Sequence, residues 1–529
     1  MARYKPLDYG QGRFISIRFE NQILPGTFEH ALSWIVDHKL DLSVFDPLYK
    51  NDATGATAYD PRGMLKIVLY AYSRGIVSSR DIERACAENV VMMALSADTR
   101  PHFTTIAGFI RDMAPVIQGL FVDALMYCDE LGLIGREMFA IDGCKISSNA
   151  SKEWSGTRED FTRKKAKFEQ SIERLIQKHK AMDEAPPGKD EDNDRPGPRP
   201  PGMREREEKA IENLKATAAR IEGWLKSHPE DKKGYAGKPV KQSMTDPDSA
   251  KMVSSHGVIQ GFNGVAAVDA KHQVVVSAEA FGTGSEAALL EPMVEKVQET
   301  FHALGDGNIY ARAKVTADSG FHTEETMKML ERKNVDGYVA DKGMRKRDPA
   351  FLTSKRHEGK IVGIQGKPVE RKYFGPDDFT FNERGKLVCP AGSEMYIGYR
   401  KHETPNGFYG VAYKSKITAC RGCALRPKCL RNPGTKFRQV YKFEGRRAPE
   451  PGAETATQRM IRKIDGAVGR FLYSRRMGIV EPVFGHLRHA LGLDRFTLRG
   501  KAKVNTQWKL FALVHNLFKI QRVGWAGTG

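Results

Sequence analysis

Three acidic residues combine a chemical type and a setting that suit metal-dependent chemistry on a phosphodiester. Asp142 and Asp318 each end a short apolar run and precede small residues, and Glu481 lies in the most basic stretch of the chain. Mg²⁺ is bound by carboxylate oxygens and phosphate oxygens together. Two such ions, about 3.5 to 4 Å apart, would hold the attacking and leaving oxygens of a phosphodiester in line. The alternative is that the two aspartates are ordinary turn residues.

The charge of the chain indicates a polyanionic partner. Its 529 residues include 84 Lys or Arg and 65 Asp or Glu, which gives a formal net charge of +19. Residues 459–503 alone hold eleven Lys or Arg against three acids. Because each cation placed on a phosphate releases a condensed counterion, this clustering favours nucleic acid over a charge that serves solubility alone. The cations that we expect to contact phosphates are Arg475, Arg476, Arg488, Arg499, Lys501 and Lys503.

Four of the seven cysteines lie close together in the sequence. They are Cys389, Cys420, Cys423 and Cys429, and the last three are separated by two and five residues. Four thiolates suit a structural Zn²⁺, and the paired cysteines have the spacing of one half of such a site. Two alternatives are four reduced, partly buried thiols and an iron–sulfur cluster.

A helical region precedes the first aspartate. Apolar residues at spacings of three and four predict helices in residues 26–130. Pro61 suits the first turn of one helix, Gly75 ends it, and residues 78–81 offer a capping box for the next. Helix, short glycine-containing turn and helix is the helix-turn-helix pattern, which serves either DNA reading or helical packing alone.

The two aspartates end predicted strands of one mixed α/β sheet. Residues 137–143 predict a buried strand that stops at Asp142-Gly143. Residues 257–340 predict a hairpin, a helix, a strand that ends at Asp318, a second helix and a last strand. Pro482 is tolerated in the first turn of a helix, so we expect a helix to begin at Glu481.

Two insertions interrupt this predicted core. Two helices with narrow apolar seams, joined by a polar loop at 186–202, predict an antiparallel helical hairpin, and a stretch rich in Gly and Pro predicts a β-rich insertion with the four cysteines. The expected domains are a helical DNA-binding domain at 1–130, a core at 131–155, 248–344 and 460–529, a helical hairpin and linker at 156–247, and the β-rich insertion at 345–459.

Several blocks of sequence resemble the signature blocks of DDE transposases of bacterial insertion sequences. Three blocks surround the three acids, and two more resemble the N-terminal helices of that family. The blocks are residues 139–146 (FAIDGCKI) with 149–152 (NASK), 316–321 (TADSGF), 480–485 (VEPVFG) with 498–500 (LRG), 59–62 (YDPR) and 79–83 (SRDIE). Together they extend over nearly the whole chain.

The resemblance implies a ribonuclease H-like core in which Asp142, Asp318 and Glu481 hold Mg²⁺ or Mn²⁺. The third block of the family often has Tyr, Arg, Glu and Lys at set intervals. Here Tyr473 and Arg476 precede Glu481 with one extra residue after the arginine, and Arg488 replaces the lysine.

The implied activity is that of a transposase. It would bind the terminal inverted repeats of its element as double-stranded DNA, cleave at the element ends and join the freed 3′ ends to target DNA, and synapsis of two ends implies a homodimer. The alternatives are a metal-dependent nuclease without strand transfer and a DNA-binding derivative that has lost catalysis. No run of about 18 apolar residues and no signal peptide are found, so we expect a cytoplasmic protein without a membrane partner.

Overall fold

The computed structural model describes two compact units, which we treat separately. Unit 1 comprises Met1–Val339 with Arg470–Gly529, and unit 2 comprises Ala340–Gly469. The described residues are 17–49, 51, 57–183, 203–231, 233, 239–254, 257–348, 351, 373–403, 408–446 and 454–524.

Unit 1 begins with a cluster of helices, as the apolar spacing predicts. Asp60 caps the second helix by accepting from the Arg62 N–H, Pro61 takes its first position, and Gly75 ends it with a φ of +74°. The helices are α1 (Phe28–His38), α2 (Pro61–Ser73), α3 (Ser79–Glu88), α4 (Val90–Leu95), α5 (Phe103–Asp112) and α6 (Ile117–Glu130).

The C-terminal helix α16 (Lys501–Lys519) joins this cluster to the sheet. It packs against α2, α6 and strand β6 (Val275–Phe281), and its residues are buried almost continuously from Val504 to Leu517. The Tyr72 ring of α2 lies 4.9 Å from that of Phe511. A helix that is buried on nearly all sides belongs to the core, so the two ends of the chain share one hydrophobic interior.

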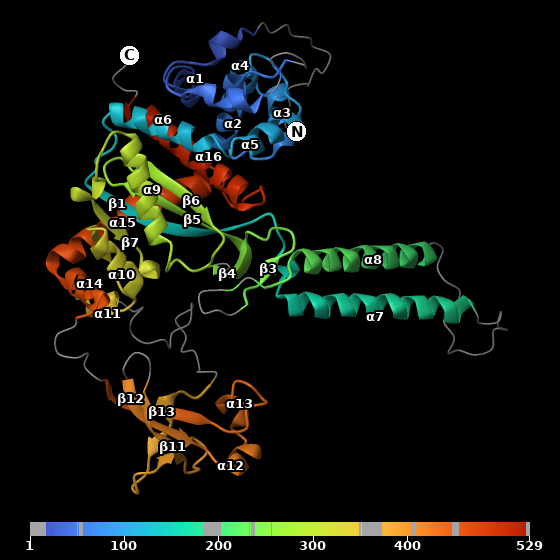
Figure 1. The fold of residues 1–529 in the computed structure, drawn as a ribbon, viewed down its shortest axis with the longest axis vertical. Coiled ribbons are helices and arrows are strands. Elements are labelled where there is room, and N and C mark those ends of the chain that lie inside the picture. The colour runs from blue at the N-terminus through green and yellow to red at the C-terminus, as the bar shows by residue number, and fades with distance from the viewer. Residues whose placement is uncertain are drawn as a thin grey trace, which may run out of the picture. The chain divides into compact units, whose positions relative to one another are not determined.

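The sheet of unit 1 is mixed (Figure 1). Strand β1 (Met138–Ser147) lies between β5 (Gly257–Asp269), which is antiparallel to it, and β7 (Lys314–Ala317), which is parallel. The outer strands are β6, antiparallel to β5, β8 (Asp336–Val339), parallel to β7, and β4 (Ala250–Ser254), β3 (Gln242–Ser243) and β2 (Ser155–Gly156) beyond β5. The predicted mixed α/β fold is therefore present.

Strand β1 is longer than predicted. It does not stop at Asp142-Gly143, because its pairing with β5 continues to Ser147 opposite Gly261. The strand needs a glycine at position 143, because a Cβ there would lie only 2.6 Å from Oδ1 of Asn263 on β5. The Asp-Gly pair reads as a turn signal in the sequence, but here the glycine makes room for a neighbouring side chain.

Helices cover both faces of the sheet. Helix α9 (Leu290–Ala303) packs on β5 and β6, with Phe301 5.1 Å from Phe139 of β1. On the opposite face Trp508 of α16 donates to the Val265 carbonyl at 3.0 Å. Helix α10 (Glu324–Arg332) follows β7 and its turn Ser319–Phe321, and packs on α9 and β8.

The predicted helical hairpin is present between β2 and β3. Helices α7 (Arg158–Asp183) and α8 (Met203–Ser227) run side by side (Figure 1), and the predicted polar loop lies outside the described residues. Phe161, Ile221 and Trp224 form a small core at the base of the pair, and Lys165 pairs with Glu222 at 3.1 Å.

Unit 2 is β-rich, as its composition predicts. An antiparallel sheet of β11 (Tyr396–Glu403), β12 (Phe408–Lys414) and β13 (Gln439–Arg446) packs near the short pair β9 (Thr380–Phe381) and β10 (Leu387–Val388). Its short helices are α11 (Met344–Arg347), α12 (Ile417–Arg421), α13 (Arg426–Cys429) and α14 (Ala456–Asp465).

Helix α15 (Ala467–Gly485) is followed by a π-helical turn (His486–Ala490).

In the described part of the chain, no single helix is both long and apolar enough to span a membrane; α5 and α6 reach that apolar content only together, across a bend of 77°.

Candidate functional site

The sheet brings Asp142 and Asp318 together. Ile141 of β1 is aligned with Ala317 of the parallel neighbour β7. The residues that follow these two, Asp142 and Asp318, are therefore also neighbours. Adjacent parallel strands place residues in the same register on the same face. Two residues that are far apart in the sequence therefore present their carboxylates side by side.

Arg476 of α15 bridges the two carboxylates. Its Nη1 donates to Asp142 Oδ2 at 2.5 Å, and its Nη2 lies 3.3 Å from Asp318 Oδ1. The arginine side chain is only 8% exposed. Because a buried charge is stable only when it is paired, this guanidinium and the aspartates depend on one another.

Burial dominates the electrostatics of Asp142. Burial raises the pKa of Asp142 to about 6, although the Arg476 charge and the Gly143 N–H, which donates to Oδ1 at 2.8 Å, act in the opposite direction. The neighbouring charge of Asp318 adds to the rise in this pKa. One arginine does not fully compensate the desolvation of this carboxylate.

A third carboxylate, which the sequence analysis missed, lies at the same site. Glu286 lies between β6 and α9, and its Oε2 is so close to Gly320 that a Cβ at position 320 would collide with it. Burial raises the pKa of Glu286; Lys145 and Arg476 lower it and Asp318 raises it, so these charges are near neighbours. In the sequence Glu286 looks like any acid at the start of a helix, and no local signal distinguishes it.

Glu481 lies on α15 but is not in contact with the two aspartates. Five residues after Arg476 on a helix, it points about 140° away from that side chain. The side chain is exposed and, among the described residues, makes no hydrogen bond or ion pair. The buried face of α15 carries Leu472, Arg476, Val480 and Val483 instead.

The predicted start of a helix at Glu481 is wrong. Pro482 lies inside α15, which begins at Ala467. Proline cannot donate to the carbonyl four residues earlier, which here belongs to Gly478. That carbonyl accepts from Gln273 Nε2 at 3.0 Å, so a side chain from the β5–β6 hairpin replaces the missing donor.

The predicted phosphate-binding cations differ in their availability. Arg475, Arg499, Lys501 and Lys503 are exposed, and Arg488 is partly buried. Arg499 Nε donates to the Asn149 carbonyl at 2.8 Å, which places this arginine beyond the end of β1. Arg476 is buried and is paired with both aspartates in this arrangement.

The four cysteines of unit 2 converge on one small cavity. Cys389, Cys420, Cys423 and Cys429 all line a space of about 30 Å³. Burial raises the pKa of Cys429, and the other three thiols raise it further while Arg438 lowers it. The four side chains are free thiols of intermediate burial.

Neither cluster is closed around a metal position. Within the described ranges, no group of three or more His, Cys, Asp or Glu side chains is set closely enough to hold a metal ion as it stands. At the aspartates the physical reason is visible, because the Arg476 guanidinium occupies the place between the two carboxylates.

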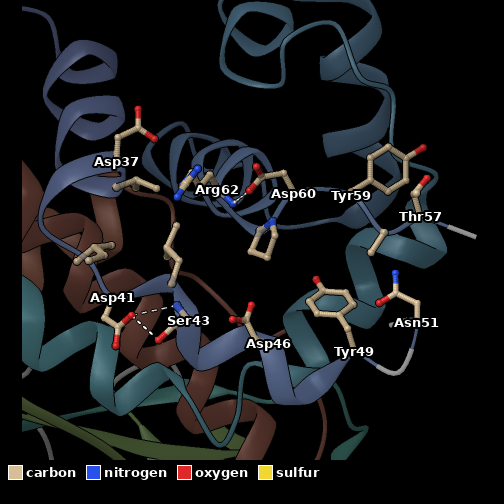
Figure 2. A pocket seen from close by; sticks show the side chains of 15 residues that line it. Asp37, Asp41, Ser43, Asp46, Tyr49, Asn51, Thr57, Tyr59, Asp60 and Arg62 are labelled. Carbon is tan, nitrogen blue, oxygen red and sulfur yellow. Dashed lines mark hydrogen bonds between the residues drawn. The ribbon is translucent and has the colours of Figure 1, made fainter. Parts of the chain in front are cut away.

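A hollow among the N-terminal helices has a different character. It measures about 870 Å³, and Figure 2 shows four aspartates around it, Asp37, Asp41, Asp46 and Asp60. Asp37 pairs with Lys66 at 2.6 Å, Asp41 accepts from the Ser43 N–H and hydroxyl, and Asp60 caps α2. Acidic walls repel phosphates, so this hollow does not suit a polyanion.

Comparison with known families agrees with this geometry. Residues 388–521 match the model of the "Transposase DDE domain", and residues 17–112 match that of the "Transposase domain (DUF772)". No curated protein matches the chain. The mixed sheet, the N-terminal helices and the two matches define a transposase. Both matches support the family that the sequence resembles, the DDE transposases of insertion sequences.

Proposed function

We propose that the protein binds the terminal inverted repeats of its insertion sequence, cleaves the DNA at the element ends and joins the freed 3′ ends to target DNA. The observation that carries this proposal is the pair Asp142, on β1, and Asp318, directly after the adjacent parallel strand β7. The strand order β6-β5-β1-β7-β8, with three antiparallel strands followed by two parallel ones, supports a ribonuclease H-like core.

The residues at this site fit a divalent cation. Two carboxylates lie side by side, an arginine occupies the space between them, and burial raises the pKa of Asp142 in spite of that arginine. Asp142 and Asp318 would hold Mg²⁺ or Mn²⁺, and Glu481, which is exposed on α15, is the third ligand that the family resemblance implies. The ion would stabilise charge on the phosphate oxygens and activate the attacking water.

The chain's own residues supply the positioning. Arg476 neutralises the aspartates before the cation arrives, and a guanidinium released from them can form two hydrogen bonds to a phosphate. Arg475, Arg488, Arg499, Lys501 and Lys503 would hold the DNA backbone. In cleavage a water oxygen bonds to phosphorus and the 3′ oxygen leaves; in joining that 3′ hydroxyl attacks a target phosphodiester and displaces its 3′ oxygen.

The remaining assignments are proposals of the same kind. The α2–α3 pair is a candidate for reading the end sequence, and synapsis of two ends calls for two copies of the chain. The protein would act in the cytoplasm, where its DNA lies. The four cysteines of unit 2 would bind a structural Zn²⁺, since the thiols already line one cavity.

A strand-transfer assay tests the catalytic proposal. Purified protein is incubated with Mg²⁺, labelled element-end DNA and a target plasmid, and joined products are counted beside cleaved ends. We expect both products from the wild type, neither from Asp142→Asn, and wild-type amounts from Asp377→Asn, an exposed control in unit 2. Cleavage without joining would indicate a nuclease, and unchanged cleavage by Asp142→Asn would overturn the catalytic assignment.

A further inference from the structure

We propose that Glu286 is a further catalytic residue, whose carboxylate binds the divalent cation together with Asp318 and Asp142. This inference rests on the proposed function and adds to it a ligand from the opposite side of the site, outside α15. Four features of the structure support it: the glycine beneath Glu286, the amide that holds it, the balance of charge around it, and the absence of a role for it in its own helix.

Gly320 makes the space that Glu286 occupies. It lies in the turn Ser319–Phe321, directly after Asp318. A Cβ at this position would overlap Glu286 Oε2, so the carboxylate rests on the glycine backbone. The small residue that follows Asp318 therefore has a spatial role: it allows a second carboxylate to approach the first.

The Asn263 side chain forms a hydrogen bond with the Glu286 carboxylate. This side chain is fully buried on β5, and its Nδ2 donates to Glu286 Oε1 at 3.4 Å. Its Oδ1 has no hydrogen-bond partner among the described residues and points at Gly143, next to Asp142. A buried amide oxygen without a partner is unfavourable, so its place beside Gly143, with the amide nitrogen on Glu286, points to a ligand such as a cation's bound water.

The charges around the site leave room for a cation. Arg476 pairs with Asp142 and Asp318, and its charge also lowers the pKa of Glu286. Lys145, opposite Asn263 across the β1–β5 pairing, donates to the Val253 carbonyl at 3.0 Å, and its charge also lowers the pKa of Glu286. Three carboxylates beside the two cations Arg476 and Lys145 leave net negative charge at the site, which suits a Mg²⁺ or Mn²⁺ ion.

The ordinary explanation for an acid near a helix start does not apply to Glu286. Helix α9 begins at Leu290, and its N-cap Leu289 receives no side-chain hydrogen bond. In the described structure the Glu286 carboxylate accepts a hydrogen bond from Asn263 and none from the N–H groups of α9. It therefore faces the aspartates rather than the amides of its own helix.

The test measures cation binding without DNA and without turnover. Mn²⁺ binding to the full-length protein is followed by electron paramagnetic resonance, with the melting temperature as a check of folding. We expect Glu286→Gln to weaken Mn²⁺ binding at least tenfold and to lower end cleavage in step. The matched control is Glu291→Gln in the first turn of α9, where the glutamate pairs with Arg332 at the surface; it should bind Mn²⁺ as the wild type does.

Parallel variants separate this inference from the proposed function. If Asp142→Asn loses Mn²⁺ and cleavage while Glu286→Gln keeps both, Glu286 is not a ligand but the proposed function stands. If Asp142→Asn keeps both, the proposed function itself fails. Gly320→Ala should imitate Glu286→Gln, because the added methyl group displaces the carboxylate.

A measurement on the wild type covers the case in which Glu286→Gln does not fold. Fe²⁺ placed in the site with ascorbate and peroxide cuts the backbone near its ligands. We expect cuts close to residues 142, 286 and 318. Cuts near 142 and 318 without any near 286 would overturn the inference.

Discussion

Arg476 donates to Asp142 across 334 residues of sequence, at 2.5 Å, and both side chains are largely buried. The guanidinium stands where the proposed function needs a cation. This relationship makes the ligand-free site stable, and it also means that a metal ion must displace a charge that the protein itself supplies.

The first prediction concerns the loss of this arginine. Arg476→Met leaves Asp142 and Asp318 buried without their shared partner, so we expect the free energy of unfolding to fall by about 3 kcal/mol at neutral pH. Excess Mg²⁺ should restore more stability to this variant than it adds to the wild type, because no guanidinium competes for the site. Urea unfolding with and without Mg²⁺ measures both effects.

The neighbouring Arg475 offers a matched control. It is exposed, so Arg475→Met should change the free energy of unfolding by less than about 0.5 kcal/mol. Equal gains from Mg²⁺ in the wild type and in Arg476→Met would show that the arginine does not occupy the cation position.

The second prediction follows from the raised pKa of Asp142. In the folded protein this pKa is about 6, above the 3.8 of an unperturbed aspartate. Between these values the folded state holds a proton that the unfolded state has lost, so the contribution of Asp142 to stability falls as the pH rises from about 4 to about 6. A shift of this size corresponds to a loss on the order of 3 kcal/mol.

Unfolding free energies measured at several pH values test this sign. The unfolding free energy of the wild type minus that of Asp142→Asn should decrease as the pH rises across that interval. The same quantity for Asp377→Asn should stay constant. At pH values above about 6, excess Mg²⁺ should restore most of the stability lost across that interval, since the ionised carboxylate then has a cation. A difference that grows with pH would contradict the burial of Asp142.

The sequence predicts those parts of the site that depend on local patterns. Asp142 and Asp318 each follow an apolar run in the sequence, and a strand–helix–strand order brings such residues to one sheet. Glu286 could not be found in this way, because its role depends on contact with Gly320 and Asn263. These contacts join segments whose local patterns are independent of one another.

Pro482 shows the same limit for secondary structure. The sequence favours a helix start there, but the carbonyl that proline leaves without a donor is satisfied by Gln273, 205 residues away in the sequence. The sequence predicts too short a strand β1 for a similar reason. Gly143 looks like a turn residue, but it is needed to leave space for the Asn263 side chain of the neighbouring strand. Rules for single residues fail where a distant side chain supplies the missing group.

The third prediction concerns zinc in unit 2. The central core of this unit is small, with Phe379, Leu387, Met395 and Val440 buried and Cys389 and Cys429 packed against them. Cores of this size usually need a further constraint, which a bound metal supplies. We expect one Zn²⁺ per chain by elemental analysis, and we expect a strong chelator to lower the melting temperature of the unit that contains these cysteines.

Single cysteine variants locate the ion. Cys423→Ser should lose the Zn²⁺, whereas Cys86→Ala should keep it, because Cys86 is buried in the N-terminal helices. Iron in place of zinc would indicate a cluster, and a chain free of metal after expression in zinc-rich medium would leave the four thiols as core residues.

The last prediction concerns the DNA surface at the start of α16. Lys501 and Lys503 are exposed there, and neither forms a salt bridge within the described residues. If each contacts a phosphate, the slope of log K against log salt for end-containing DNA should become shallower by about 0.9 for each lysine removed. We therefore expect Lys501→Gln with Lys503→Gln to reduce the slope by nearly two and to weaken binding most at low salt.

Lys328→Gln is the control, because Lys328 is exposed on α10 and pairs with Glu324 of its own helix. A slope that the double variant leaves unchanged would place the DNA elsewhere on unit 1, since removing a phosphate contact must reduce the number of counterions released.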